Sequence, residues 1–283
     1  MHRTWKWGAL ALGGLVLGIA AWPLAIYLRS EAAIRRHYPL ATPQIHEQVA
    51  KDAAARGAHL VRILGCTDCH GANLKGGQFD GARFYAPSLR RDPATLTDRD
   101  FARAVRFGLK GDGTSLWGMP SESYLYMREA DVDAIIAYVR TLPPDHAAPP
   151  AQSFDLSVRR AILNGRFVPA GEAVQSTLSP IDLGPRYDGG RYLARTACSQ
   201  CHGLDLAGSP DGSAPDLSRV EFYSPSDFFQ LLHRGKLRDG RIAKDKSHQA
   251  GWRFSHFADY EAFALYNYLY VRSYAVKVTR TPN

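Results

Sequence analysis

The four cysteines of this 283-residue chain fall into two identical frames, and a histidine follows each frame directly. The frames are residues 66–70, Cys-Thr-Asp-Cys-His, and residues 198–202, Cys-Ser-Gln-Cys-His. Thiols and imidazoles in such a pattern can hold zinc, exchange electrons as a dithiol, form structural disulfides or carry a covalently attached porphyrin. The spacing of the residues distinguishes these chemistries.

A zinc site is disfavoured because the frames lie 132 positions apart, whereas paired zinc ligands usually lie within a few tens of residues. A thioredoxin-like pair needs one frame, and neither it nor a disulfide explains the two histidines. Two thiols one helical turn apart can form thioethers to one porphyrin, whose iron the adjacent histidine can then bind. The frames therefore predict two covalent haem c groups, held by Cys66, Cys69, Cys198 and Cys201, with iron ligands His70 and His202.

The composition is that of a globular protein, with 45% hydrophobic and 22% charged residues, which excludes wholesale disorder and a polytopic membrane protein. The length allows one large or two small domains. The net charge is +8, but the basic residues are scattered along the chain, so we expect no nucleic-acid partner.

The N-terminal residues predict a membrane anchor. Residues 7–28 carry no charged side chain and are flanked by Arg3, Lys6 and Arg29, which is about the length that a bilayer requires. The stretch is longer than the apolar part of an ordinary signal peptide, and residues 22–24, Trp-Pro-Leu, make a poor cleavage site. We therefore expect one uncleaved transmembrane helix.

The sequence around the two frames is repeated. Matching segments are 56–57 with 188–189, 70–76 with 202–208, 86–89 with 214–217, and 131–139 with 261–269. Helical spacing of apolar residues predicts helices over 46–64 and 131–142, the latter ending before Pro143. Two copies of one fold are therefore predicted.

Each copy resembles a class I cytochrome c domain, and the pair resembles a membrane-anchored bacterial dihaem cytochrome c. The resemblance implies an all-α fold with tandem cytochrome c-like domains after one transmembrane helix. It also implies that the domains lie on the periplasmic side of the inner membrane, although the arginines after the anchor favour the opposite orientation. The expected divisions are an anchor at 1–28, a stalk at 29–45, domains at 46–143 and 184–273, a linker at 144–183 and a tail at 274–283.

The resemblance also implies the other haem contacts of the first copy. The sixth iron ligand of such domains is usually a methionine, and Met119, between Gly118 and Pro120, is favoured over Met127, which lies near the start of the closing helix. The carbonyl of Pro87 is expected to accept the Nδ1 proton of His70, and that of Pro215 the proton of His202.

The second copy has no methionine. Carrying Met119 across the repeat gives residues 246–249, where His248 is the natural ligand because neutral imidazole binds haem iron well. The alternatives are Lys246, which must first lose its proton, another histidine such as His233 or His256, and an open or water-bound iron.

The leading functional hypothesis is an electron carrier with no catalytic residues. It would pass single electrons between a dehydrogenase or quinol-oxidising complex and a terminal oxidase or soluble cytochrome, tethered to the inner membrane. One alternative is a dihaem enzyme, similar to a peroxidase or a thiosulfate-oxidising cytochrome, that reacts at its second iron. Another is the cytochrome subunit of an alcohol or aldehyde dehydrogenase complex.

Overall fold

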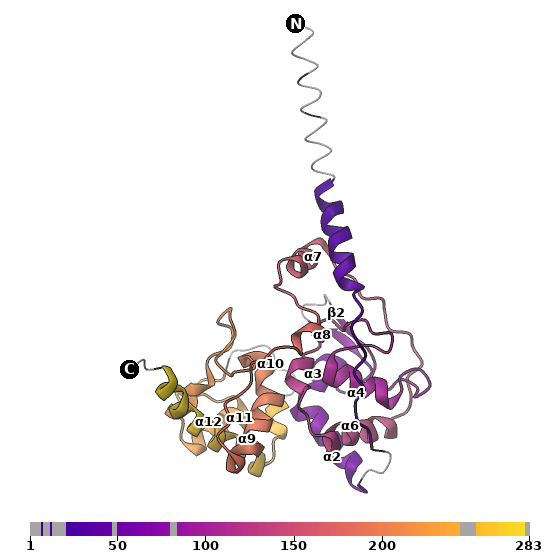
Figure 1. Cartoon of the computed structure of the whole chain (residues 1–283). Coiled ribbons are helices and arrows are strands. Elements are labelled where there is room, and N and C mark those ends of the chain that lie inside the picture. The colour runs from indigo at the N-terminus through magenta and orange to yellow at the C-terminus, as the bar shows by residue number, and fades with distance from the viewer. Residues whose placement is uncertain are drawn as a thin grey trace.

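The computed structural model describes residues 7, 12, 21–46, 50–79, 84–243 and 253–280. Helices make up most of it, and two helical halves lie side by side, with one further helix projecting from the first (Figure 1). The expected all-α fold is wrong in one respect, because strands β1 (Gly77–Phe79) and β2 (Phe84–Ala86) form a two-stranded antiparallel sheet. Strands of three residues are too short for an alternating hydrophobic pattern to reveal them.

The predicted transmembrane helix is also corrected. Of residues 7–28, only 7, 12 and 21–28 are among the described residues, and residues 21–34 form a helix. Within the described part of the chain, no helix is long and apolar enough to cross a membrane. This finding overturns the expectation of single-pass anchoring and of the inner-membrane localisation that depended on it.

The helix over residues 21–34 packs against α7 (Leu156–Leu163), a short helix between the two halves (Figure 1). Arg159 of α7 makes the contact: its Nη1 donates to Ser30 Oγ at 2.8 Å and forms an ion pair with Glu31 Oε2 at 3.0 Å. Its guanidinium also lies 4.2 Å from the centre of the Tyr27 ring.

Beyond this helix the chain follows the first half, where the Tyr38 N–H donates to the Gly113 carbonyl at 2.9 Å. Residues of the segment expected to be a stalk therefore contact both α7 and the first half.

The first half is built on two crossing helices. Its helices are α2 (Ala53–Ile63), α3 (Cys66–His70), α4 (Asp98–Phe107), α5 (Ser121–Tyr124) and α6 (Glu129–Thr141). Helix α2 crosses α6 at Gly57, where a Cβ atom would lie only 1.9 Å from the Ala134 carbonyl oxygen. This approach requires glycine at residue 57. Helix α6 ends just before Pro143, which disfavours helical geometry in the residue before it.

The second half repeats this crossing. Its helical segments are η1 (Pro185–Tyr187), α9 (Asp188–Leu193), η2 (Ala194–Cys198), α10 (Ser199–His202), η3 (Leu217–Phe222), α11 (Pro225–Arg234), η5 (Arg253–His256) and α12 (Asp259–Arg280). Helix α9 crosses α12 at Gly190, where a Cβ atom would lie 2.2 Å from the Ala264 carbonyl oxygen. The sequence comparison paired Gly57 with Gly189, but a Cβ atom at Gly189 would meet nothing within 4 Å. Gly190 is therefore the structural counterpart of Gly57.

The hydrophobic core is shared between the halves. One cluster of buried residues contains Leu64 and Val132 of the first half together with Leu193 and Leu265 of the second. A smaller cluster, formed by Phe84, Trp117, Val158 and Ile162, attaches α7 to the first half. The linker therefore packs against the first half through this second, smaller apolar cluster.

Candidate functional site

The first Cys-x-x-Cys-His segment forms a single helical turn, α3. Gly65 precedes the turn with φ +82° and Gly71 follows it with φ +77°, so left-handed glycines bound it on both sides. Cys66 and Cys69 are three residues apart on this turn and so share one face of it, as two thioethers to one planar group require. His70 at the end of the turn is buried.

His70 is held in the form that binds iron. Its Nδ1 lies 2.7 Å from the carbonyl oxygen of Pro87, to which it donates. Burial lowers the pKa of His70, although the hydrogen bond to Pro87 acts in the opposite direction, and the ring is thus kept neutral. With its proton on Nδ1, the neutral ring carries its lone pair on Nε2, the atom that would face the metal.

The second segment holds its histidine in the same way, but it continues directly from η2 and is not preceded by a left-handed glycine. Cys198 ends η2, and the turn of α10 runs to His202, whose Nδ1 lies 2.7 Å from the carbonyl oxygen of Pro215. The loops that follow also match, because Leu74 and Leu206 are the two non-glycine residues of the described chain with positive φ, at +58° and +62°. Such residues are uncommon, so their equivalent positions show that the two loops share one backbone path.

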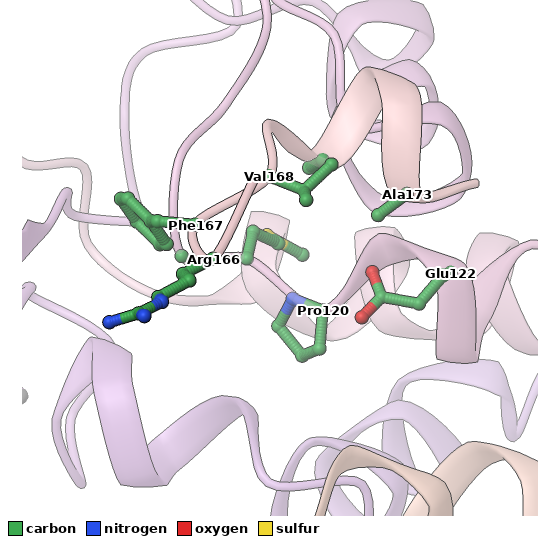
Figure 2. Close-up of a pocket in the computed structure, with 9 residues that line it drawn as sticks. Pro120, Glu122, Arg166, Phe167, Val168 and Ala173 are labelled. Carbon is green, nitrogen blue, oxygen red and sulfur yellow. The ribbon is translucent and has the colours of Figure 1, made fainter. Parts of the chain in front are cut away.

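Met119 lies in a loop that the linker covers. Gly118 before it has φ +79°, and Pro120 follows it. The loop lines a pocket of about 300 Å³, in which Pro120 and Glu122 of the first half face Phe167, Val168 and Ala173 of the linker (Figure 2). Met127, by contrast, is buried in the hydrophobic core.

The predicted ligand of the second iron, His248, lies outside the described residues, as does Lys246. Two of the alternative histidines are described. His256 is exposed, and the Nε2 atom of His233 is buried 3.8 Å from Asp259 Oδ1.

The first half contains buried donors that fit a haem. Arg106 Nε and Nη2 and Trp117 Nε1 are buried donors for which the described residues provide no acceptor, and donors of this kind normally have one. A porphyrin attached at Cys66 and Cys69 would bring two carboxylates, which are acceptors of the required charge. The sequence analysis did not identify Arg106 and Trp117 as site residues. The signal available for Arg106 was its place as a charged residue in an amphipathic helix, and the signal for Trp117 was its place two positions before Met119.

The first half matches a known protein family. The matched residues, 54–143, include the frame at 66–70 and both Pro87 and Met119. The family is cytochrome c, which these residues match. Cytochrome c domains carry covalently attached haem and transfer electrons.

Three relatives that match a larger part of the chain are named as cytochromes. The chain is 25% identical to the fructose dehydrogenase cytochrome subunit of Gluconobacter japonicus, over 77% of this chain and 52% of that protein. It is 26% identical to the cytochrome c subunit of the quinone alcohol dehydrogenase of Komagataeibacter europaeus, over 76% and 54% respectively. A dihaem cytochrome c-type protein of Cereibacter sphaeroides is 29% identical over 66% of this chain and 74% of that protein. The chain thus spans about half the length of the two dehydrogenase cytochromes.

Proposed function

We propose that the protein is a dihaem c-type cytochrome that accepts single electrons from a dehydrogenase and passes them to another redox protein. The observation that carries this proposal is the pair of Cys-x-x-Cys-His turns, in which each histidine Nδ1 lies 2.7 Å from a proline carbonyl oxygen. The match to cytochrome c over residues 54–143 supports a haem at the first turn, and the matching hydrogen bond from His202 to Pro215 supports a second haem at the other.

The first haem would be bound through Cys66 and Cys69, with His70 and Met119 as iron ligands. The carbonyl of Pro87 keeps the proton of His70 on Nδ1, fixes the plane of the ring and raises the basicity of the ligating nitrogen. A haem iron bound in this way alternates between its ferrous and ferric states and so stores one electron.

The second haem would be bound through Cys198 and Cys201, with His202 and His248 as iron ligands. The carbonyl of Pro215 orients His202 as that of Pro87 orients His70. A thioether ligand raises the potential of a haem, whereas a second imidazole stabilises the ferric form. Electrons would therefore run from the second half to the first.

The relatives support a dehydrogenase as the electron donor, because two of them are cytochrome subunits of dehydrogenases. The chain would then be the electron-transfer subunit and the partner would oxidise the substrate. Its net charge of +8 would speed association with an acidic partner surface at low ionic strength.

Electron paramagnetic resonance of the oxidised, haem-loaded protein tests the ligand assignment. We expect two low-spin ferric signals, one altered in Met119→Ala and the other in His248→Ala. Met127→Leu is the matched control, because this residue packs in the core, and it should leave both signals in place.

A high-spin signal in the wild type that His248→Ala does not change would contradict bis-histidine ligation. It would favour the alternative of an enzyme that reacts at an open second iron. Mass spectrometry of the denatured chain tests the haems themselves: we expect the mass of the polypeptide plus two haems, and the mass of one haem would refute the second site.

A further inference from the structure

The second Cys-x-x-Cys-His segment is hydrogen-bonded to the first. Gln200, one of its two inner residues, places Nε2 2.9 Å from the carbonyl oxygen of Leu64, which lies two residues before Cys66. The same nitrogen lies 2.9 Å from the hydroxyl of Tyr124, which itself donates to the Leu64 carbonyl at 2.7 Å. Gln200 is also anchored within its own half, to the carbonyl of Thr196 at 2.8 Å.

The other inner residue, Ser199, contacts the helix that follows the Met119 loop. Its hydroxyl donates to that of Ser123 in α5 at 2.8 Å. One turn earlier, Arg195 Nη2 donates to the carbonyl of Glu122 at 3.1 Å. The second segment therefore touches both the flank of the first segment and the helix that continues from Met119.

Most partners in this contact are buried, and Gln200 itself is half-buried. Leu64 is fully buried, and the exposed fractions of Tyr124, Ser123 and Ser199 are 4%, 1% and 5%. A hydrogen-bonded network in such surroundings is stronger and more rigid than one in water. It therefore fixes the distance between the two segments.

The contact is not a general consequence of the motif. In the first segment the position equivalent to Gln200 is Asp68, and its side chain is exposed. This difference between the two segments indicates that Gln200 contributes to the contact between the halves rather than to the covalent attachment of a haem.

We propose that Gln200 and Tyr124 form the electron-exchange junction between the two sites, an inference that rests on the proposed function. With both haems bound, one electron would pass from the ferrous site to the ferric site, so that one iron would be oxidised as the other is reduced, with no bond formed or broken. The hydrogen bonds of Gln200 and Tyr124 to the Leu64 carbonyl would shorten the electron-transfer path from Cys198 and Cys201 to Cys66. They replace gaps between non-bonded atoms with contacts below 3 Å. Gln200 and Tyr124 are positioning residues, since neither ligates iron.

The test compares Gln200→Ala, Tyr124→Phe and the matched control Asp68→Ala in the haem-loaded protein. The main measurement is the rate at which an electron equilibrates between the two sites after flash photoreduction of the oxidised protein. We expect this rate to fall several-fold in Gln200→Ala, to fall less in Tyr124→Phe, and to be unchanged in Asp68→Ala. The two midpoint potentials should stay close to those of the wild type in all three variants.

Amide hydrogen exchange over residues 64–70, compared between variants and wild type, shows whether a variant has disturbed the local fold or has lost only the hydrogen bonds of the junction. Tyr124→Phe keeps the ring and should keep wild-type protection, so a slower rate in this variant reports the hydrogen bond itself. Unchanged rates in both Gln200→Ala and Tyr124→Phe would overturn the proposal. Failure of the proposed function would look different, since the wild type itself would then lack a second haem or a second one-electron step.

Discussion

At the scale of single residues, the site depends on backbone carbonyls as much as on side chains. Two prolines, Pro87 and Pro215, place carbonyl oxygens 2.7 Å from the ring nitrogens of His70 and His202. Mutation of a proline side chain leaves its carbonyl in place, so the informative change is at Met119, the other proposed iron ligand of the first half.

Replacement of Met119 by histidine should lower the potential of the first haem. The thioether stabilises the ferrous form, whereas imidazole stabilises the ferric form, and a change of axial ligand shifts the potential by on the order of 100 mV or more. Potentiometric titration of Met119→His beside Met127→His measures the shift. A similar fall in the Met127 variant alone would assign the ligand to Met127.

Glu261 should make stability depend on pH. Burial alone would raise its pKa, but hydrogen bonds from His59 and from the Ala258 N–H, together with nearby positive charge, hold the pKa of Glu261 below its ordinary value. The stabilisation that Glu261 contributes is therefore complete above its ordinary pKa of 4.5 and disappears as the pH falls through the lower folded pKa. The bond joins α2 to α12, since His59 Nε2 lies 2.8 Å from Glu261 Oε2.

Thermal unfolding of wild type and Glu261→Gln at several pH values checks this expectation. At pH 7 the variant should be less stable by about 1 kcal/mol, and the difference should shrink as the pH falls below about 4. Glu129→Gln changes an exposed glutamate and serves as the control. A difference that stays constant down to pH 3 would exclude the ionised carboxylate as its cause.

At the scale of elements, each half depends on one close helix crossing. Gly57 and Gly190 let the opening helices approach the closing helices α6 and α12 so nearly that a methyl group would collide with a carbonyl oxygen. The two glycines lie in helices, where glycine is otherwise unfavourable. Their presence is therefore explained by packing.

Gly57→Ala and Gly190→Ala should each destabilise the protein by about 1–3 kcal/mol or more, because the helices must separate. Gly189→Ala is the matched control: its methyl group meets nothing within 4 Å, and it should be stabilising by about 0.5–1 kcal/mol. Denaturant unfolding measures all three variants. Destabilisation by Gly189→Ala with no effect of Gly190→Ala would restore the register that the sequence comparison indicated.

The helices that carry the repeated motifs could be predicted from the sequence, but their exact pairing could not. Apolar spacing indicated the closing helices, whereas the choice between Gly189 and Gly190 depends on a crossing angle that no local pattern encodes. The strands β1 and β2 fall where the first copy is four residues longer than the second, a difference that locates an insertion but not its conformation. The Gln200 junction joins residues 136 positions apart, so no spacing rule could indicate it.

At the scale of the whole molecule, polar contacts hold the halves together beside the shared core. Asp131 accepts hydrogen bonds from Tyr192 of the second half and from Arg56, both at 2.6 Å. Asp131 is buried, so both bonds lie in surroundings of low polarity. Residues 21–34 are attached separately, through Arg159.

Arg159→Ala should release the helix over residues 21–34 from α7. The change removes an ion pair, a hydrogen bond and a cation–π contact, and cleavage by trypsin near Arg35 and Arg36 should therefore become faster. Arg160→Ala is the control, because the contact that Arg160 makes with the described part of this helix is the longer one to the Trp22 ring, at 5.4 Å. Equal cleavage of wild type and Arg159→Ala would show that the apolar contacts of α7 hold the helix without Arg159.

The central claim, that this chain carries two one-electron sites, is tested most directly by potentiometric titration of the haem-loaded protein followed by its visible absorbance. We predict that full reduction takes up two electrons per chain in two one-electron steps, each with the absorbance change of a c-type haem. Uptake of a single electron per chain, in one step, would contradict the second site and with it the account of two coupled halves.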